Sequence, residues 1–323
     1  MRTPGIDVVV PSFRRPASLR RCLAGLAAQT PRPTRVLVVA RADDTPTRDA
    51  ARASAVDHGD ALPLELVTVA DPGLVAALRA GVAASRAPRV AFTDDDAIPR
   101  AGWLAGLGRV LDEPGVGVAG GRDFQPRELG PARRTVGVLT PLGRYVGDHH
   151  LGVGPPRDVH VVKGVNMAYR QEALAVPRAG VLEGSGAEIH SEELMCSWAR
   201  ARGWRVRFDP AVAVDHRVDA DEALAGGSDP RRERASLQAS AHNRMLGTIA
   251  TDPERAPLHV AYGLLVGTRE APGLTRTAVA LLRGERDIAQ RIAPSLAGQW
   301  AGARDSRALH TAMIPASELR RGC

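Results

Sequence analysis

The chain has 323 residues, enough for one large domain or two smaller ones, and a globular composition, 44% hydrophobic and 24% charged. The formal net charge of +7 suits a partner that carries phosphates, but only 3% of the residues are aromatic, which argues against a base-stacking surface and so against nucleic acid as partner. Three scattered cysteines exclude a disulfide framework or a zinc knuckle and fit a reducing cytoplasm, where we expect the protein to act.

The sequence offers no membrane-spanning segment. No stretch reaches the roughly 20 apolar residues that cross a bilayer, and the N-terminal residues have no signal-peptide pattern. The most apolar candidate, residues 257–268, is predicted to be a buried helix.

The first 120 residues alternate short apolar runs with stretches of helical periodicity. Because strands that alternate with helices form mainly parallel sheets covered on both faces, we expect a Rossmann-like α/β fold. In such sheets ligands bind beyond the carboxyl ends of the strands. Strands are predicted at 6–10, 36–40, 64–69, 90–92 and 116–119, and helices at 16–26, 45–58, 74–82 and 103–111.

Three acids follow the fourth predicted strand directly, in the segment RVAFTDDDAIP (89–99). Clustered carboxylates raise one another's pKa, and a divalent cation such as Mg²⁺ or Mn²⁺ removes that cost. Asp94 and Asp96 would share one face of an extended chain. The alternative is an acidic turn that caps the helix beginning near Ala101.

The second half has a different pattern. Residues 121–156 are rich in Gly, Pro, Arg and His and are predicted to be long loops. The segment 163–170 has an apolar strand end, a glycine and an asparagine, followed by helix-like residues. A helix is predicted from Ser191 to Gly203, and two short strands, 204–208 and 211–214, lead to Asp215 and His216.

Five segments in this order carry a resemblance: VVVPSFRRPASLRRCLAGLAAQT, FTDDDAIP, VKGVNMAYR, SEELMCSWARARGW and FDPAVAVDH. Together the five resemble the family 2 glycosyltransferases, which have the GT-A fold, over residues 6–217. The resemblance implies an inverting transfer of a sugar from a nucleoside-diphosphate sugar, with a UDP-sugar favoured, to an acceptor hydroxyl. The acceptor would be a saccharide, a lipid-linked compound or a small molecule.

The same resemblance assigns candidate residues. FTDDDAIP matches the family's DxD element, so Asp94 and Asp96 are candidate ligands of Mn²⁺ or Mg²⁺, and His216 matches a position that approaches the metal in some relatives. The donor would be contacted by residues from several strand ends and the third helix, with Arg14, Arg15, Arg79 and Lys163 open to the alternative of ordinary solvated cations. These candidates are Pro11, Ser12, Arg14, Arg15, Asp43, Asp44, Arg79, Asp94, Asp95, Lys163, Gly164 and Asn166.

An inverting displacement needs a general base that takes the acceptor's proton. The family supplies an acidic pair at the start of a helix, which here corresponds to Glu192 and Glu193, with Glu192 the first choice. The alternative is a pair of first-turn glutamates favoured by the helix dipole. His149 and His150 are adjacent and so make a poor chelate, which leaves them as candidate acceptor contacts.

We expect a GT-A catalytic domain at 1–218, with a nucleotide-binding half (1–120) and an acceptor-binding half (121–218). A helical accessory region would follow at 219–323, where amphipathic, arginine-bearing segments could also dock on a membrane surface. Two other functions stay open. A nucleotidyltransferase would also use clustered acids, but PSFRRP (11–16) lacks the glycines of a phosphate loop, and a non-catalytic basic module leaves the ordered motifs unexplained.

Overall fold

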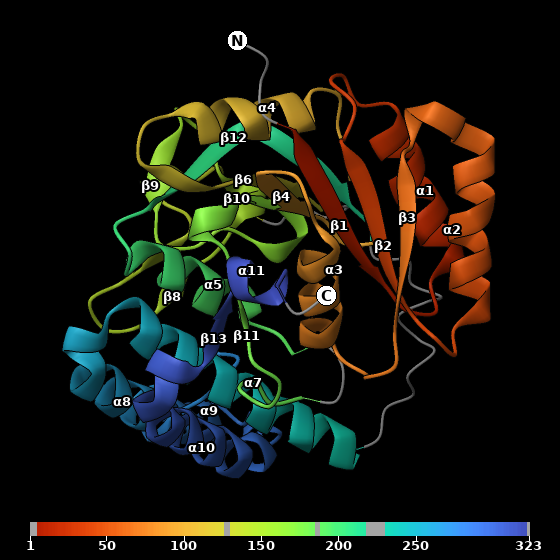
Figure 1. The fold of residues 1–323 in the computed structure, drawn as a ribbon. Helices are drawn as coiled ribbons and strands as arrows, with labels where there is room; N and C mark the ends of the chain where they lie inside the picture. Colours follow the sequence, from red (N-terminus) through yellow and green to blue (C-terminus); the bar gives the residue numbers. More distant parts are fainter. Residues whose placement is uncertain (1–4, 126–129, 185–187, 218–229, 322–323) are drawn as a thin grey trace.

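The structure of the protein is a computed structural model that describes residues 5–125, 130–184, 188–217 and 230–321 (Figure 1). The expected domain boundary at 218/219 lies outside these residues. Within the described residues a nine-stranded sheet has the order β3-β2-β1-β4-β10-β6-β12-β5, with β9 beside β12. Its strands are β1 (Ile6–Ser12), β2 (Arg35–Arg41), β3 (Leu64–Val69), β4 (Arg89–Phe92), β5 (Ala97–Pro99), β6 (Val116–Phe124), β9 (Arg157–Val159), β10 (Met167–Arg170) and β12 (Arg205–His216).

Helices cover both faces of this sheet, as expected. One face packs on α1 (Pro16–Ala27), α2 (Thr45–His58) and α4 (Trp103–Asp112), and the other on α3 (Leu74–Ala84) and α5 (Ser191–Arg200). Strand β1 shows why a strand between two helical layers is mainly apolar: Val8 and Val10 enter the first core and Val9 the second, so all three side chains are buried.

The sheet is less uniformly parallel than the sequence predicts. Strands β3, β2, β1 and β4 run parallel, and so do β6 and β12, whereas β10, β5 and β9 are antiparallel to their neighbours. The helix-like residues after Asn166 are strand β10, because Met167 and Tyr169 enter one core and Ala168 the other. The two short strands predicted at 204–214 are one irregular strand, β12.

The C-terminal region is helical, and it packs against the sheet domain through α5 (Figure 1). It contains α7 (Pro230–Thr251), α8 (Ala256–Leu265), α9 (Leu274–Leu282), α10 (Ile288–Asp305) and α11 (Ala316–Leu319). Strand β13 (Met313–Pro315) pairs with β11 (Ala175–Pro177), and β7 (Val138–Leu139) pairs with β8 (Tyr145–Val146).

Two segments of the second half differ from their predicted structure. Helix α8 corresponds to the predicted buried helix at 257–268, but it buries only His259 and Gly263, while Leu258 and Leu265 are exposed. The residues predicted to be long loops include the end of β6, which continues to Phe124. Among the described residues, no helix combines the length and apolarity needed to cross a membrane.

Candidate active site

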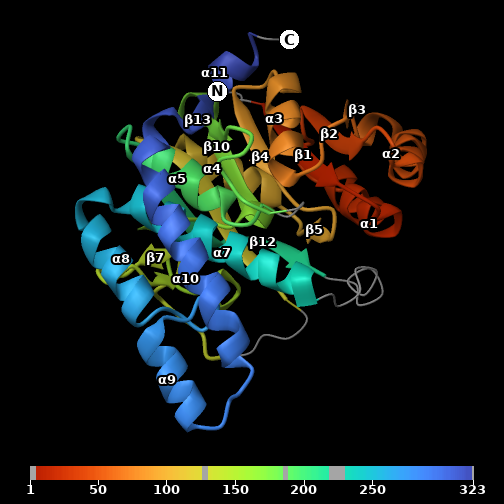
Figure 2. The ribbon, with the colours of Figure 1, turned by 90° about the horizontal axis from the view of Figure 1, so that it is seen from below.

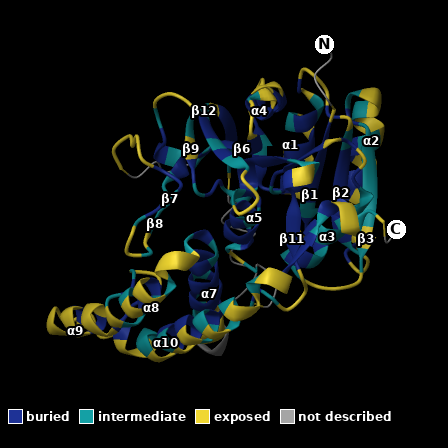
Figure 3. Cartoon of the chain, turned by 60° about the vertical axis from the view of Figure 1, so that its left-hand side comes forward, coloured by how far each residue is buried: buried dark blue, intermediate teal, exposed yellow. Residues whose placement is uncertain are grey.

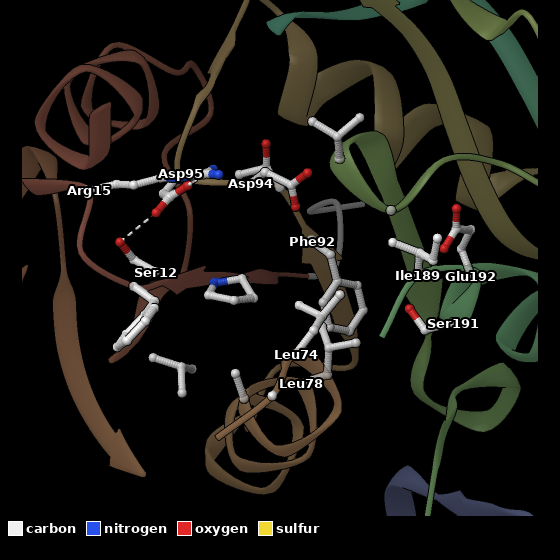
Figure 4. Close-up of a pocket in the computed structure, with 18 of the residues that line it drawn as sticks. Ser12, Arg15, Leu74, Leu78, Phe92, Asp94, Asp95, Ile189, Ser191 and Glu192 are labelled. Atoms are coloured by element: carbon white, nitrogen blue, oxygen red, sulfur yellow. Dashed lines mark hydrogen bonds and ion pairs between the residues drawn. The ribbon is translucent and has the colours of Figure 1, made fainter. Parts of the chain in front are cut away.

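A cavity of about 620 Å³ opens where β1, β2, β3 and β4 end and α3 and α5 begin (Figure 4). This is the carboxyl edge of the parallel strands, where the sequence predicts a ligand site. Ser12 and Asp95 lie on one side of the cavity, and Ser191 and Glu192, at the first turn of α5, lie on the other (Figure 4). The wall between these two sides is apolar and is formed by Leu74, Leu78 and Phe92.

Two of the three predicted metal ligands line the cavity, and all three converge at its edge. Each of Asp94, Asp96 and His216 offers a ligand atom, and these atoms lie within 4.8 Å of one another. His216 Nε2 lies 3.4 Å from Asp96 Oδ1. Asp94 and His216 line the cavity itself. Carboxylate and imidazole ligands at this spacing suit a divalent cation such as Mn²⁺.

The electrostatics of this cluster fit a cation. Burial, followed by the charge of Asp96, raises the pKa of Asp94 to about 7. Burial would lower the pKa of His216, but the neighbouring carboxylates of Asp123 and Asp96 outweigh it and raise that pKa to about 9. The buried Oδ1 of Asp96 and Nδ1 of His216 have no hydrogen-bond partner within the described chain. A divalent ion would remove the repulsion between the carboxylates.

Asp95 has a different role from its two neighbours. Its Oδ2 accepts a hydrogen bond from Ser12 Oγ at 2.7 Å, and its Oδ1 accepts one from Arg15 Nη1 at 3.2 Å. Arg15 Nη1 also donates to Asp96 Oδ2 at 2.8 Å. Burial raises the pKa of Asp95 to about 6, against the effect of Ser12 and Arg15. Asp95 therefore ties the loop after β1 to the acidic turn.

Asp123, at the end of β6, is a functional candidate that sequence reasoning missed. Its buried Oδ2 accepts from Lys163 Nζ at 2.7 Å and lies 3.9 Å from His216 Nδ1. Burial alone would raise the pKa of Asp123, but His216 and Lys163 hold it well below its usual range. Asp123 thus faces the ring nitrogen of His216 that points away from Asp96. Carboxylates in this position orient histidine ligands of metals.

The two candidate bases point in different directions. Glu192 lines the cavity, and burial raises its pKa. Glu193 is buried on the side of α7: its Oε1 lies 3.0 Å from His190 Nδ1, and a Cβ added to Gly247 would lie 2.3 Å from its Oε2. The carboxylate of Glu193 therefore does not line the cavity. Of the two glutamates, only Glu192 is accessible from it.

The structure places the remaining predicted donor residues in two groups. Pro11, Ser12, Arg15, Lys163 and Gly164 line the cavity, together with Phe13, Arg41 and Asp71, which sequence reasoning missed. Phe13 follows β1 directly and is 46% exposed, and the guanidinium groups of Arg14 and Arg41 lie 4.9 and 5.7 Å from the centre of its ring. The signal available in the sequence was an aromatic residue that follows the first predicted strand.

The second group of five predicted donor residues does not line the cavity: Arg14, Asp43, Asp44, Arg79 and Asn166. Asp44 caps α2, because it accepts from the backbone N–H groups of Arg14 and Thr47. Asp43 is exposed and pairs with Arg41. Arg14 is exposed beside the ring of Phe13.

Arg79 lies on α3 beside a different hollow, lined also by Arg178 and Glu318.

Asn166 is held by the protein itself. It is fully buried, its Oδ1 accepts from Trp103 Nε1 at 2.8 Å, and its Nδ2 donates to the carbonyl groups of Arg122 and Val212. Through these three hydrogen bonds Asn166 joins β6, β12 and α4. His149 is likewise buried, with Nε2 against the Val161 carbonyl, and does not line the cavity.

A second group within the described residues, Glu183, His242 and Asp305, also has metal-ligand spacing. Here His242 Nδ1 lies 2.9 Å from Asn243 Oδ1 and Nε2 lies 3.2 Å from Asp305 Oδ2, while Arg304 also binds Asp305. These contacts explain why the three residues lie together, because they form an ion-pair network that joins α7 and α10.

Comparisons with known proteins agree with this geometry. The family described as "Glycosyltransferase like family 2" matches residues 4–238. The pre-mycofactocin glycosyltransferase of Mycobacterium tuberculosis (strain H37Rv) is 29% identical over 252 residues, which cover 69% of this chain and 46% of that protein. The chain thus spans about half the length of the curated relatives that it matches.

Two solved structures are also similar to the chain, and the first supports the fold. A mannosyltransferase from Pyrobaculum calidifontis, in complex with GDP-Man and Mn²⁺, is similar with a TM-score of 0.52 and 19% identity, over 95% of this chain and 87% of that one. Glucosyl-3-phosphoglycerate synthase from Mycobacterium tuberculosis has a TM-score of 0.48 and 19% identity, over 76% and 80% of the two chains. Since the family pattern covers most of its length, the chain belongs to the family 2 glycosyltransferases and has the GT-A fold.

Proposed function

We propose that the chain is an inverting glycosyltransferase that moves a sugar from a nucleoside-diphosphate sugar to an acceptor hydroxyl. The observation that carries this proposal is the arrangement around one cavity: a three-ligand acidic and imidazole cluster on one side, and the carboxylate of Glu192 on the other. An inverting displacement needs these two functions on opposite sides of the sugar.

Asp94, Asp96 and His216 would hold the cation, Mn²⁺ or Mg²⁺. When bound, such an ion neutralises the charge that develops on the departing diphosphate. Two features support this assignment. The buried Oδ1 of Asp96 has no hydrogen-bond partner among the described residues, with His216 Nε2 3.4 Å away, and burial together with the charge of Asp96 raises the pKa of Asp94, so a bound cation would stabilise both carboxylates.

The chain's own residues would position the two substrates. Phe13 and Pro11 offer apolar surface to the nucleobase, and Arg15 and Lys163 bring positive charge toward the diphosphate. Glu192 would accept the proton of the acceptor hydroxyl on its carboxylate oxygen as that hydroxyl attacks the sugar. Burial keeps the pKa of Glu192 above its ordinary value, which makes it a stronger base than a solvated glutamate.

The donor and acceptor are proposed by class. A UDP-sugar is the favoured donor, although the Pyrobaculum calidifontis mannosyltransferase was solved with GDP-Man. The acceptor is a saccharide, a lipid-linked compound or a small molecule, met in the cytoplasm. Apolar wall residues beside Glu192, such as Ile189 and Leu74, would contact it or the donor sugar.

Calorimetry with UDP, GDP, and their sugar conjugates tests the donor site, with Mn²⁺ or with chelator. We expect binding that needs the metal and that Asp96→Ala abolishes. Asp158→Ala is the matched control, since Asp158 is a surface acid outside the cavity that pairs with Arg205 and Arg207. If no nucleoside diphosphate binds the wild type under either condition, the proposal is wrong.

A pair of glutamate variants tests the base. Glu192→Gln should retain donor binding but lose turnover by about 10²–10⁴-fold. Glu193→Gln is the matched control, because its carboxylate lies outside the cavity. A greater loss of turnover in Glu193→Gln than in Glu192→Gln would reverse the assignment. The anomeric configuration of the product, measured by NMR, tests inversion.

A further inference from the structure

Glu188 connects helix α3 to the short segment that leads into α5. Its carboxylate Oε2 accepts a hydrogen bond from the backbone N–H of Val75, the second residue of α3, at 2.7 Å. Leu74 lines the cavity from α3, whereas Ile189, which follows Glu188 directly, lines it beside Glu192 (Figure 4). The contact thus joins two sides of the cavity that are 113 residues apart in the sequence.

Helix α3 has no capping side chain of its own. It begins after Gly73, which has no side chain, and its first turn contains no acid. The first N–H groups of a helix have no partner within the helix, and a carboxylate is stabilised there by the helix dipole. A Cβ added to Gly73 would lie 2.5 Å from Glu188 Oε2, at a φ of +115°. Glycine at this position therefore lets the carboxylate of Glu188 reach the start of the helix.

The segment from Glu188 to His190 has an uncommon backbone conformation. Both of these residues have positive φ angles, 38° and 76°. Such conformations cost free energy in residues other than glycine, so neighbouring contacts must hold them. Glu188 provides one such contact with α3. Asn243 of α7, which packs along α5 (Figure 2), provides another, because its Nδ2 donates to the carbonyl group of Ile189 at 3.0 Å. The segment is thereby held between α3 and α7.

The position of Glu192 depends on this segment. Most of α5 is buried (Figure 3), so packing fixes the body of the helix. Glu192 is instead the second residue of the helix, and only Ile189, His190 and Ser191 separate it from Glu188. Ile189, His190 and Ser191 all line the cavity together with Glu192. Releasing Glu188 from α3 would therefore loosen the part of the wall that carries Glu192.

We propose that Glu188 is a positioning residue for the transfer: by holding residues 188–190 against α3, it fixes the carboxylate of Glu192 relative to the donor. This role rests on the proposed function, in which Glu192 is the base. Glu188 does not itself line the cavity, so it acts through Glu192. Because a reaction is more sensitive than binding to a small misplacement of the reacting groups, loss of the contact should lower turnover more than donor affinity.

Release of UDP from UDP-glucose in the presence of Mn²⁺ tests the proposal with the full chain. In this assay water takes the place of the acceptor: its oxygen bonds to the anomeric carbon, UDP departs, and Glu192 takes the proton. Glu188→Ala should lower kcat about 10–100-fold. Its calorimetric Kd for UDP should stay unchanged, and the stoichiometry of UDP binding counts the correctly folded sites.

Two further variants separate positioning from a general loss of structure. Glu188→Gln retains a side-chain oxygen that accepts from the same N–H group, so it should keep most of the wild-type kcat. Glu254→Ala is the matched control, because Glu254 is an exposed glutamate just before α8 and outside the cavity. It should have the kcat of the wild type.

A wild-type kcat per UDP-binding site in Glu188→Ala would overturn the proposal, and so would an equal loss of kcat in Glu188→Ala and Glu188→Gln. Either result, obtained beside an active wild type, removes only the role of Glu188. A wild type that neither binds UDP nor releases it from UDP-glucose would instead contradict the proposed UDP-sugar reaction, and the role of Glu188 with it.

Discussion

The carboxylate of Asp123 lies 3.9 Å from Nδ1 of His216, on the side of the ring opposite Asp96. The same carboxylate oxygen accepts a hydrogen bond from Lys163. Asp123 therefore connects the proposed metal cluster with the one lysine of the sequence. This arrangement places a negative charge beside the imidazole, at a distance too long for a hydrogen bond, and pairs the cavity-lining lysine with a buried acid from β6.

Replacing Asp123 by asparagine should weaken metal binding, because the neutral amide no longer orients His216 or balances Lys163. We expect the Kd for Mn²⁺, measured by calorimetry or electron paramagnetic resonance, to rise about 10–100-fold. Asp158→Asn is the control, since Asp158 is a surface acid paired with Arg205 and Arg207. An unchanged Kd in Asp123→Asn would show that the acid is only part of the core.

Binding of Mn²⁺ should become stronger as pH rises. Without metal, the pKa of Asp94 is about 7 and that of His216 is about 9, so both groups carry protons over much of the neutral range. Because both must lose the proton to become ligands, affinity should increase between about pH 6 and pH 8.5, by up to about tenfold per proton and pH unit.

Calorimetry in buffers of different ionisation enthalpy checks this release of protons directly. The variant His216→Asn should bind more weakly and with a shallower pH dependence, because one of the two titrating ligands is gone. Affinity that is constant across this range, with no proton release, would contradict the assignment of Asp94 and His216 as ligands.

Phe13 should contribute to donor affinity through its exposed ring. If the nucleobase stacks on it, Phe13→Ala should weaken nucleoside-diphosphate binding by about 1–3 kcal/mol. The side chain is 46% exposed, so thermal stability should change little. Phe13→Tyr keeps the ring and should retain affinity. Equal calorimetric Kd values for the wild type and Phe13→Ala would remove Phe13 from the donor site.

Asn166→Ala should destabilise the fold. The substitution leaves Trp103 Nε1 and the carbonyl groups of Arg122 and Val212 without their partner inside the core, at a cost of about 2–4 kcal/mol in the free energy of unfolding. Chemical denaturation measures it, with Gln290→Ala, which removes an exposed amide from α10, as the control. Unchanged stability together with lost donor binding would instead favour the ligand contact that the resemblance implies.

The fold of residues 6–124 was largely predictable because β1, β2 and β4 lie between two helical layers and are therefore mainly apolar. The same logic located Asp94 and Asp96, which follow directly after a buried strand. It did not locate Asp123, because the Gly- and Arg-rich end of β6 has no apolar periodicity. Asn166 shows a different limit: its three partners come from segments far apart in sequence, so only the folded structure reveals that it is a core residue.

The choice between the two glutamates was also beyond the sequence. Glu192 and Glu193 are adjacent in a helix, so they point about 100° apart, and either could face the substrate. The packing of α7 against α5 covers Glu193, whereas Glu192 lines the cavity.

The pairing of β13 with β11 has a consequence for how the protein is made. Ala175 pairs with Pro315, which the ribosome adds 140 residues later. Strand β11 precedes α5, which carries Glu192, in the sequence. Helix α11 follows β13 directly and packs against α3, on the other side of the cavity. During synthesis this edge stays open until residues 313–319 have left the exit tunnel, so the cavity reaches its final form only after these residues have been added.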